Sequence, residues 1–212
     1  PRNHLLLSTM DEKAPFLARE YGLGLELADF TYAPMMEDPE RIRRAIEKIR
    51  GMPALLFHAP FAELCPCAID PRVRQVSMDR VIQSSKLAVS LGISRVLFHG
   101  GFVPLVYFPE WYVEQSVLFW KEALERIPRE LTLVLENVME PGPETLTEIA
   151  KGVDDPRLGL CLDVGHANTI VSKTPPLSWA EPMGPWLRHV HLHDNTGDLD
   201  THSPLGRGKI PV

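Results

Sequence analysis

The sequence predicts an α/β protein with a parallel sheet, arranged as a (β/α)8 TIM barrel that lacks its last βα unit within these 212 residues. Three observations lead to this prediction. Short apolar runs alternate with amphipathic stretches along the whole chain, as in consecutive βαβ units. Successive side chains of a strand point to opposite faces. In most of these runs the apolar side chains lie on one face, and a His, Glu or Asp lies on the other. Those polar residues recur roughly every 27 to 41 residues, which is about one βα unit.

Seven strands and five helices follow from this alternation, whereas a closed barrel has eight strands and about 250 residues. We expect strands at Leu5–Thr9, Leu23–Asp29, Ala54–Ala59, Arg95–His99, Leu131–Asn137, Leu158–Asp163 and His189–His193. We expect helices at Asp38–Arg50, Pro71–Leu91, Glu110–Arg126, Glu144–Lys151 and Trp179–Trp186. Asp38 and Asp70 each precede a proline, as is common at helix starts. Gly51 and Gly92 stand where helix C-terminal caps belong.

One polar side chain of nearly every strand is expected on the inner face of the sheet. The apolar parity should pack against outer helices, and the polar parity should point into the barrel. The inward residues are Glu26, His58, His99, Glu136 and Asp163. Ligands of parallel α/β folds and barrels bind at the C-terminal ends of the strands. We therefore expect these side chains to converge with His191 of the last strand, although His189 and His193 share its face.

The composition is that of one soluble globular domain, which we expect to span residues 1–212. The chain has 44% hydrophobic and 24% charged residues. Its net charge of -6 offers no global basic surface of the kind that duplex DNA requires. Three cysteines argue against a disulfide framework and favour a reducing compartment, the cytoplasm. No apolar run approaches the roughly 18 residues of a membrane span, and no pattern indicates an oligomeric state.

The segment His189–Gly208 is dense in histidine and aspartate. Together with the strand-end residues, it resembles the xylose isomerase-like TIM barrel superfamily. Within that superfamily the likeness is to the endonuclease IV branch (AP endonuclease family 2), with sugar phosphate isomerases and epimerases as further relatives. The resemblance runs from the second strand onward and rests on FHAPF, LFHGG, LENV, LDVGH, HLHDN and DTHSPLGRG. The last of these, following LDVGH at this distance, is the most specific part.

The resemblance implies a site for three zinc ions. Endonuclease IV-like enzymes hold these ions with nine ligands, and eight positions here match: His58, His99, Glu136, Asp163, His166, His191, Asp200 and His202. The first three would hold one ion, and Glu136 would bridge to a second ion, shared with Asp163 and His191. The remaining three would hold a third ion. The ninth ligand, a glutamate of the last strand, would lie beyond Val212. Imidazole and carboxylate donors without thiolate suit Zn²⁺ or Mn²⁺.

A cluster of this kind suits phosphoester hydrolysis, because divalent ions lower the pKa of a bound water and neutralise charge on a phosphoryl group. We expect hydrolysis of a small phosphorylated substrate, with Glu136, Asp163 and His166 as catalytic residues. The alternative is a sugar or sugar-phosphate isomerase or epimerase, for which Glu136, Asp163 and His191 would serve equally well. Isomerase chemistry would give no role to His58, His99, Asp200 and His202. A metal-holding interaction domain without turnover is a third class.

An abasic-site endonuclease is the second alternative, and the loops argue against it. The loops TYAPMMEDPE, FAELCPCAIDP, GFVPLVYFPE and MEPGPE hold six glutamates, two aspartates and no Lys or Arg. Each neutralised phosphate draws on a basic side chain, and only Lys173, Arg207 and Lys209 offer positive charge near this face. We expect a compact substrate of the phosphorylated or sugar type, with neither duplex DNA nor a membrane as partner.

Each candidate also has a purely structural explanation. The carboxylates could form buried ion pairs, the strand-end histidines could be hydrogen-bonded core residues, and Asp200 with His202 could belong to a plain surface loop. Glu26 could support the site or pair with an Arg or Lys. Cys65 and Cys67 fit a turn better than a metal site. The aromatic residues from Phe102 to Tyr112 fit core packing and an apolar rim equally, and Phe61 is not expected to wedge into DNA.

Overall fold

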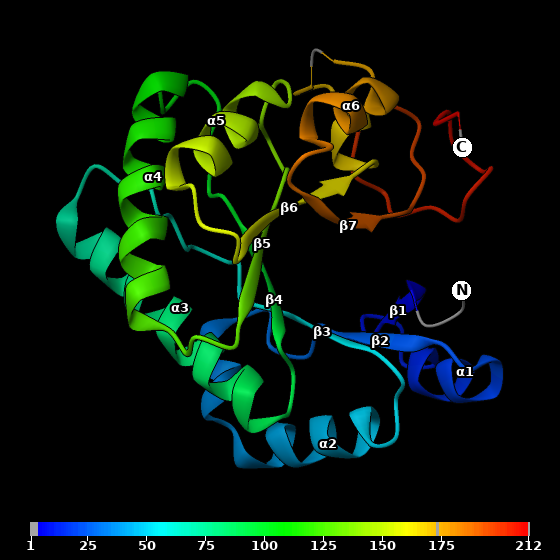
Figure 1. The fold of residues 1–212 in the computed structure, drawn as a ribbon. Helices are drawn as coiled ribbons and strands as arrows, with labels where there is room; N and C mark the ends of the chain where they lie inside the picture. The colour runs from blue at the N-terminus through cyan, green and yellow to red at the C-terminus, as the bar shows by residue number, and fades with distance from the viewer. Residues whose placement is uncertain (1–3, 173, 212) are drawn as a thin grey trace.

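The computed structural model describes residues 4–172 and 174–211, which form a seven-stranded parallel sheet with helices on its outer side (Figure 1). The strands are β1 (Leu6–Ser8), β2 (Gly24–Leu27), β3 (Leu55–His58), β4 (Arg95–His99), β5 (Thr132–Glu136), β6 (Leu158–Asp163) and β7 (Leu187–His191). They pair in sequence order from β1 to β7. Within the described residues no backbone pairing joins β7 to β1, so the sheet curves through most of a barrel without closing. The predicted parallel barrel architecture is confirmed.

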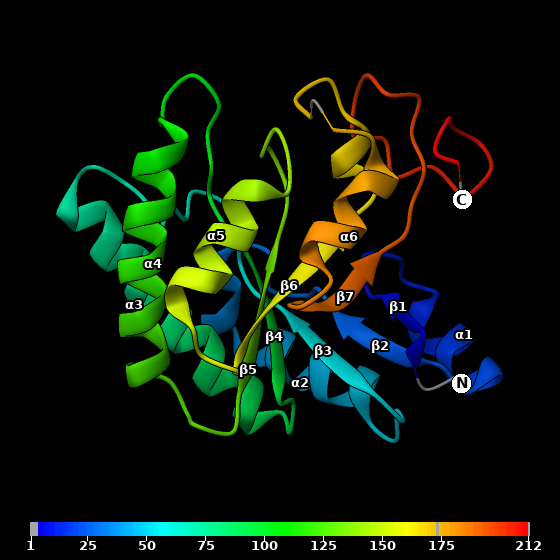
Figure 2. The same cartoon turned by 45° about the horizontal axis from the view of Figure 1, so that its top comes forward.

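The helices cover the outer side of the curved sheet, as the rotated view also shows (Figure 2). They are α1 (Ala14–Tyr21), α2 (Pro39–Ile49), α3 (Pro71–Ser90), α4 (Pro109–Arg126), α5 (Glu144–Val153) and α6 (Ala180–Met183), with 3-10 turns η2 (Ala33–Glu37), η3 (His166–Asn168) and η4 (Pro176–Trp179). Asp38 and Asp70 cap α2 and α3 by accepting backbone N–H bonds of the first turn. Gly51 and Gly92 follow these helices with φ of 76° and 73°, the left-handed conformation predicted for them.

Three elements differ from the prediction: α1, α6 and β7. Helix α6 covers only Ala180–Met183 of the expected Trp179–Trp186, because Trp179 ends the 3-10 turn η4. Helix α1 was not expected, because its eight residues carry only a short apolar pattern. The last strand was expected at His189–His193, but β7 runs over Leu187–His191. The run of histidines suggested a later start, whereas pairing with β6 begins at Leu160 opposite Leu187. His193 therefore lies beyond the strand, in the turn that follows it.

The sheet has a distinct core on each face. On the outer face, residues such as Phe57, Phe98 and Leu133 join one large cluster with the helices, centred on Trp120 and Trp179. On the inner face, four fully buried side chains from adjacent strands form a small apolar layer: Leu56, Leu97, Val134 and Cys161. This layer is the floor on which the polar residues of the strand ends stand. Among the described residues, none of the helices has the length and apolar character needed to cross a bilayer.

Candidate metal centre

Six polar side chains converge above the inner apolar floor at the C-terminal ends of the strands. In β3 to β6 each lies two residues after a floor residue and therefore on the same face. These four are His58, His99, Glu136 and Asp163, and they are joined by Glu26 of β2 and His191 of β7. All six line one cavity of about 1330 Å³ along the inner side of the sheet. The structure thus brings together every strand-end residue that the parity pattern selected.

Glu136 is the hub of the first group. Its Oε2 lies 3.1 Å from His99 Nε2 and 3.7 Å from His58 Nε2. Its Oε1 lies 2.8 Å from His191 Nδ1 and 3.4 Å from His166 Nδ1. The side chain is almost completely buried, and Oε2 has no hydrogen bond that would satisfy it. Burial opposes ionisation, but the nearby charges of His191 and His99 outweigh it and hold the pKa of Glu136 well below its usual range.

Asp163 is held in place by an extension of the sheet. The Asn137 side chain follows β5 and bonds the Asp163 backbone twice, accepting from its N–H at 2.7 Å and donating to its C=O at 3.0 Å. The Asp163 carboxylate then accepts from the His166 backbone N–H at 2.7 Å and lies 3.1 Å from His193 Nε2. The turn Asp163–His166 is thereby fixed from both sides, which orients His166 toward the cavity.

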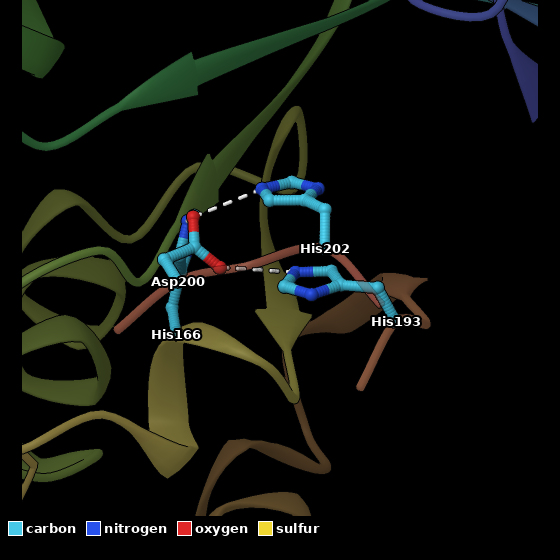
Figure 3. Close-up of side chains that lie close together, drawn as sticks. All are labelled: His166, His193, Asp200 and His202. Atoms are coloured by element: carbon cyan, nitrogen blue, oxygen red, sulfur yellow. Dashed lines mark hydrogen bonds and ion pairs between the residues drawn. The ribbon is translucent and has the colours of Figure 1, made fainter. Parts of the chain in front are cut away.

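Asp200 gathers a second group above the ends of β6 and β7 (Figure 3). Its Oδ2 lies 2.9 Å from His202 Nε2 and 3.2 Å from His166 Nε2, and its Oδ1 lies 3.7 Å from His193 Nε2. The rings of His193 and His202 are stacked, with centroids 3.9 Å apart. Asp200 and His202 therefore do not belong to a plain surface loop, because the loop folds back over the strand ends. Burial disfavours the charged His166 ring, but its bond to Asp200 prevails and raises the pKa of His166 to about 10.

Glu26 joins a third group with two histidines of β7. Its Oε2 lies 2.9 Å from His191 Nε2 and 3.3 Å from His189 Nε2. Of the two alternatives for Glu26, support of the site or pairing with an Arg or Lys, the structure favours the first, since its ion-pair partners are the site histidines. Burial opposes its ionisation, but hydrogen bonds from His189 and His191 lower the pKa of the Glu26 carboxyl well below its usual value. His191 thus faces a carboxylate from each ring nitrogen.

The donor atoms fit divalent metal ions. Five groups of three or four donors have all their ligand atoms within 4.8 Å of one another, and each of the eight predicted ligands belongs to at least one group. His58 donates its Nδ1–H to the Ala59 carbonyl at 2.9 Å, and His166 donates its Nδ1–H to the Asn137 carbonyl at 2.8 Å. These bonds leave each Nε2 free to face a carboxylate, which is how metal-ligating histidines are commonly oriented. Glu136 Oε2, which faces imidazole nitrogens without a hydrogen bond, and His193 Nδ1 are buried polar atoms that an additional partner would satisfy.

Two donors of the site were not assigned from the sequence. His189 and His193 share the parity of His191, and that parity was the only signal for them. Choosing among the three required knowing where β7 ends and how it pairs. A register shift in β6 between Leu160 and Cys161 sets His189 opposite Cys161 and His191 opposite Asp163.

The remaining singled-out residues form the cavity wall and the core. The Phe61 ring stacks on His99 with centroids 4.7 Å apart, so it belongs to the pocket. Cys65 and Cys67 lie with sulfurs 3.6 Å apart in the turn after β3. The aromatic residues divide, since Phe102 and Tyr112 are buried and Phe108 is exposed. Lys173 lies outside the described residues.

The acidic loops present less free charge than their composition indicates. Asp38 and Asp70 cap helices, and Glu37 pairs with Arg80 at 2.7 Å. Glu140 is buried, accepting from the Tyr112 hydroxyl at 2.7 Å and from the Val138 backbone N–H at 2.7 Å. Burial raises the pKa of this carboxyl above its ordinary value. Several acidic side chains of these loops are therefore already engaged by helix caps, an ion pair or burial.

A family model described as "Xylose isomerase-like TIM barrel" matches residues 17–212. The TTHB071 protein of Thermus thermophilus, in a structure soaked with ZnCl2, is 30% identical over all of this chain and 85% of its own, with a TM-score of 0.79. A D-tagatose 3-epimerase-like protein is 25% identical over 98% of this chain and 82% of its own, with a TM-score of 0.80. A probable endonuclease 4 of Mesomycoplasma hyopneumoniae is 26% identical over 74% of this chain. The chain spans 62%, 61% and 60% of the length of three curated relatives that it matches.

Proposed function

The chain belongs to the xylose isomerase-like TIM barrel family, and from this premise we propose that it is a divalent-metal-dependent enzyme that hydrolyses a phosphoester in a small phosphorylated substrate. Zn²⁺ is the proposed ion and Mn²⁺ the alternative, as the mixed imidazole and carboxylate donors favour. Members of this superfamily include both an endonuclease and epimerases, so the reaction has to be argued from this chain's own residues.

The observation that carries the proposal is the number of donors beyond those of a single-ion site. Glu136, Asp163 and His191 would be enough to hold one ion. The structure adds His58 and His99 on the far side of Glu136, within one donor group. It also places Asp200 and His202 beside His166 in another. Donors on both sides of a shared carboxylate suit adjacent ions, which supports phosphoryl chemistry more than proton transfer on a sugar.

Each residue of the cluster would have its own role in binding the ions and the substrate. Glu136 would bridge neighbouring ions through its two oxygens, one of which faces His99 and the other His191. Bound divalent ions would supply Lewis-acid activation and charge neutralisation for phosphoester cleavage. Asp163 would hold the substrate-facing side of the cluster and His166 would hold the ion beside it, and Asn137 positions both residues. Phe61 would give the substrate an apolar contact and would help to exclude water from the cluster.

One observation favours a second candidate, a sugar or sugar-phosphate isomerase or epimerase. The cavity is lined by apolar residues such as Phe61, Leu64 and Val138 beside the carboxylates, and this wall would suit an uncharged sugar ring. Abasic-site cleavage of duplex DNA is a weaker candidate, because the four loops TYAPMMEDPE, FAELCPCAIDP, GFVPLVYFPE and MEPGPE hold acidic residues and no Lys or Arg.

The test begins with the metal content of the longest available form of the protein, prepared without chelator. Less than one equivalent, with no uptake of added Zn²⁺, would remove the metal-dependent proposal. The loaded protein is then assayed on a small phosphodiester, on ketose epimerisation and on an abasic-site duplex at low salt. We expect phosphodiester turnover that falls sharply in His99→Ala and is unchanged in Gln75→Ala, a control variant on the exposed surface of α3.

The competing outcomes are distinct. Epimerisation without phosphodiester turnover would replace the first candidate with the second. Fast and specific incision of the duplex would show that the acidic rim does not prevent DNA binding. Metal uptake with no turnover on any substrate would point to an interaction domain.

A further inference from the structure

We propose that His193 completes a four-donor metal site with His166, Asp200 and His202, and that the ion at this position has no open coordination position and holds the loop 194–203 against the strand ends. The inference rests on the proposed function in one respect, because it requires that the protein binds a divalent ion. It goes beyond the ligand set that the resemblance implies, which gives this position only three protein donors.

The four side chains come from three separate segments and face one space (Figure 3). His166 begins the turn after β6, His193 follows the end of β7, and Asp200 and His202 come from the loop beyond. One donor atom from each residue lies within 4.8 Å of the donor atoms of the other three. Asp200 is central, since both its oxygens face imidazole nitrogens of the group.

The backbone around His193 is shaped to admit its ring. A Cβ atom at Gly165 would lie only 1.8 Å from His193 Cε1, so only glycine leaves room for the imidazole at this place. The ring is also covered by His202, which stacks on it at 3.9 Å. The His193 side chain is 11% exposed, and its Nδ1 has no hydrogen-bond partner. A largely buried imidazole that fills the space left by a glycine, with one nitrogen unsatisfied, is expected to have a specific role.

The competing explanation is that His193 serves Asp163 alone. Its Nε2 lies 3.0 Å from Asp163 Oδ1, within hydrogen-bond distance, and 3.7 Å from Asp200 Oδ1. In that case His193 would be a hydrogen-bond donor and the third ion would keep three protein donors. The two explanations differ in what happens when the imidazole is replaced by a side chain that donates a hydrogen bond but coordinates Zn²⁺ poorly.

The number of protein donors decides what the ion does. Zinc sites with four protein ligands are structural, whereas catalytic sites keep one position open for water or substrate. Three imidazoles and one carboxylate would fill a tetrahedral shell. The ion would then fix the loop 194–203, including the exposed His202, instead of contacting the reacting group. Without His193 the same ion would have an open position.

The experiment compares the wild type, His193→Ala, His193→Gln and the control Gln75→Ala on the exposed surface of α3, in the longest available form of the protein. Zn²⁺ retained against a competing chelator is counted, Co²⁺-loaded protein is examined for the visible absorption of tetrahedral coordination, and hydrogen exchange is followed over residues 194–203. We expect both His193 variants to lose one tightly held equivalent, with affinity at that position reduced at least ~10-fold. We also expect them to lose tetrahedral absorption and to exchange faster in the loop.

The outcomes separate the inference from the proposed function. If His193→Gln behaves like the wild type while His193→Ala does not, His193 is a hydrogen-bond donor and the four-donor site is wrong. If both variants keep the wild-type stoichiometry, spectrum and loop protection, the inference is overturned while metal dependence stands. If the wild type itself takes up no ion, the proposed function fails first. If His193→Ala does not fold, His193→Gln alone decides between ligand and hydrogen-bond donor.

Discussion

Replacing Asn137 by alanine should destabilise the protein and loosen the candidate metal centre together. The Asn137 side chain extends the hydrogen bonding between β5 and β6, because its amide bonds both the N–H and the C=O of Asp163. It is 1% exposed, so water cannot take over these bonds without entering the core. Each buried backbone group left without a partner costs about 1–3 kcal/mol. Two such groups predict a loss of roughly 2–6 kcal/mol in the free energy of unfolding.

The assay is equilibrium urea unfolding of the metal-free protein, followed by Zn²⁺ titration of the folded variants. Asn168→Ala is the matched control, since Asn168 donates a single bond to the Asn195 side chain at 2.9 Å. It should cost about 0.5–1.5 kcal/mol, the usual net value of one hydrogen bond. Zn²⁺ affinity should fall in Asn137→Ala because Asp163 and His166 lose their anchor. A stability loss no larger than that of the control, with unchanged Zn²⁺ affinity, would refute the role given to this amide.

Three further predictions follow from the site. Gly165→Ala should lower stability by about 1–3 kcal/mol through overpacking against His193; a chemical denaturation midpoint equal to that of wild type would contradict the steric argument. The His166 pKa of about 10 lies above its unfolded value, so the stability it lends the metal-free protein is complete below about 6.5 and is lost as the pH rises through 10. Because Zn²⁺ must displace that proton, the Zn²⁺ affinity should rise with pH over this range. Calorimetry in two buffers should show that protons are released on binding. A Zn²⁺ affinity that does not depend on pH would argue against His166 as a ligand. Glu26→Gln should lower the pKa of His191 in an NMR titration and weaken Zn²⁺ binding ~10–100-fold, whereas an unchanged titration would show that Glu26 does not orient that ring.

The sequence predicted which polar residues lie at the strand ends, because two local patterns determine them. Alternation along a strand assigns His58, His99, Glu136 and Asp163 to one face, whatever the rest of the chain does. The regular recurrence of strand and helix makes the strands parallel, so those residues gather at one edge. Helix caps at Asp38 and Asp70 were equally local. The apolar layer beneath them, made by Leu56, Leu97, Val134 and Cys161, was found only in the structure.

Only the tertiary structure determined how β7 and the loop 194–203 pack against the C-terminal ends of the other strands. The parity of the β7 histidines was readable, but a register shift against β6 decides which of them faces Asp163, and no local pattern encodes it. The curvature of the sheet brings β7 across to Glu26 of β2, a contact between residues 165 positions apart in the sequence. The loop 194–203 is closed at its base because Asp194 and Ser203 exchange two backbone hydrogen bonds of 2.8 Å. The Asp194 carboxylate also accepts backbone N–H bonds from Gly206, Gly208 and Ile210, which holds the following segment beside the loop. Periodicity fixes the face and the end of a strand, whereas packing between distant segments fixes which donors share a space.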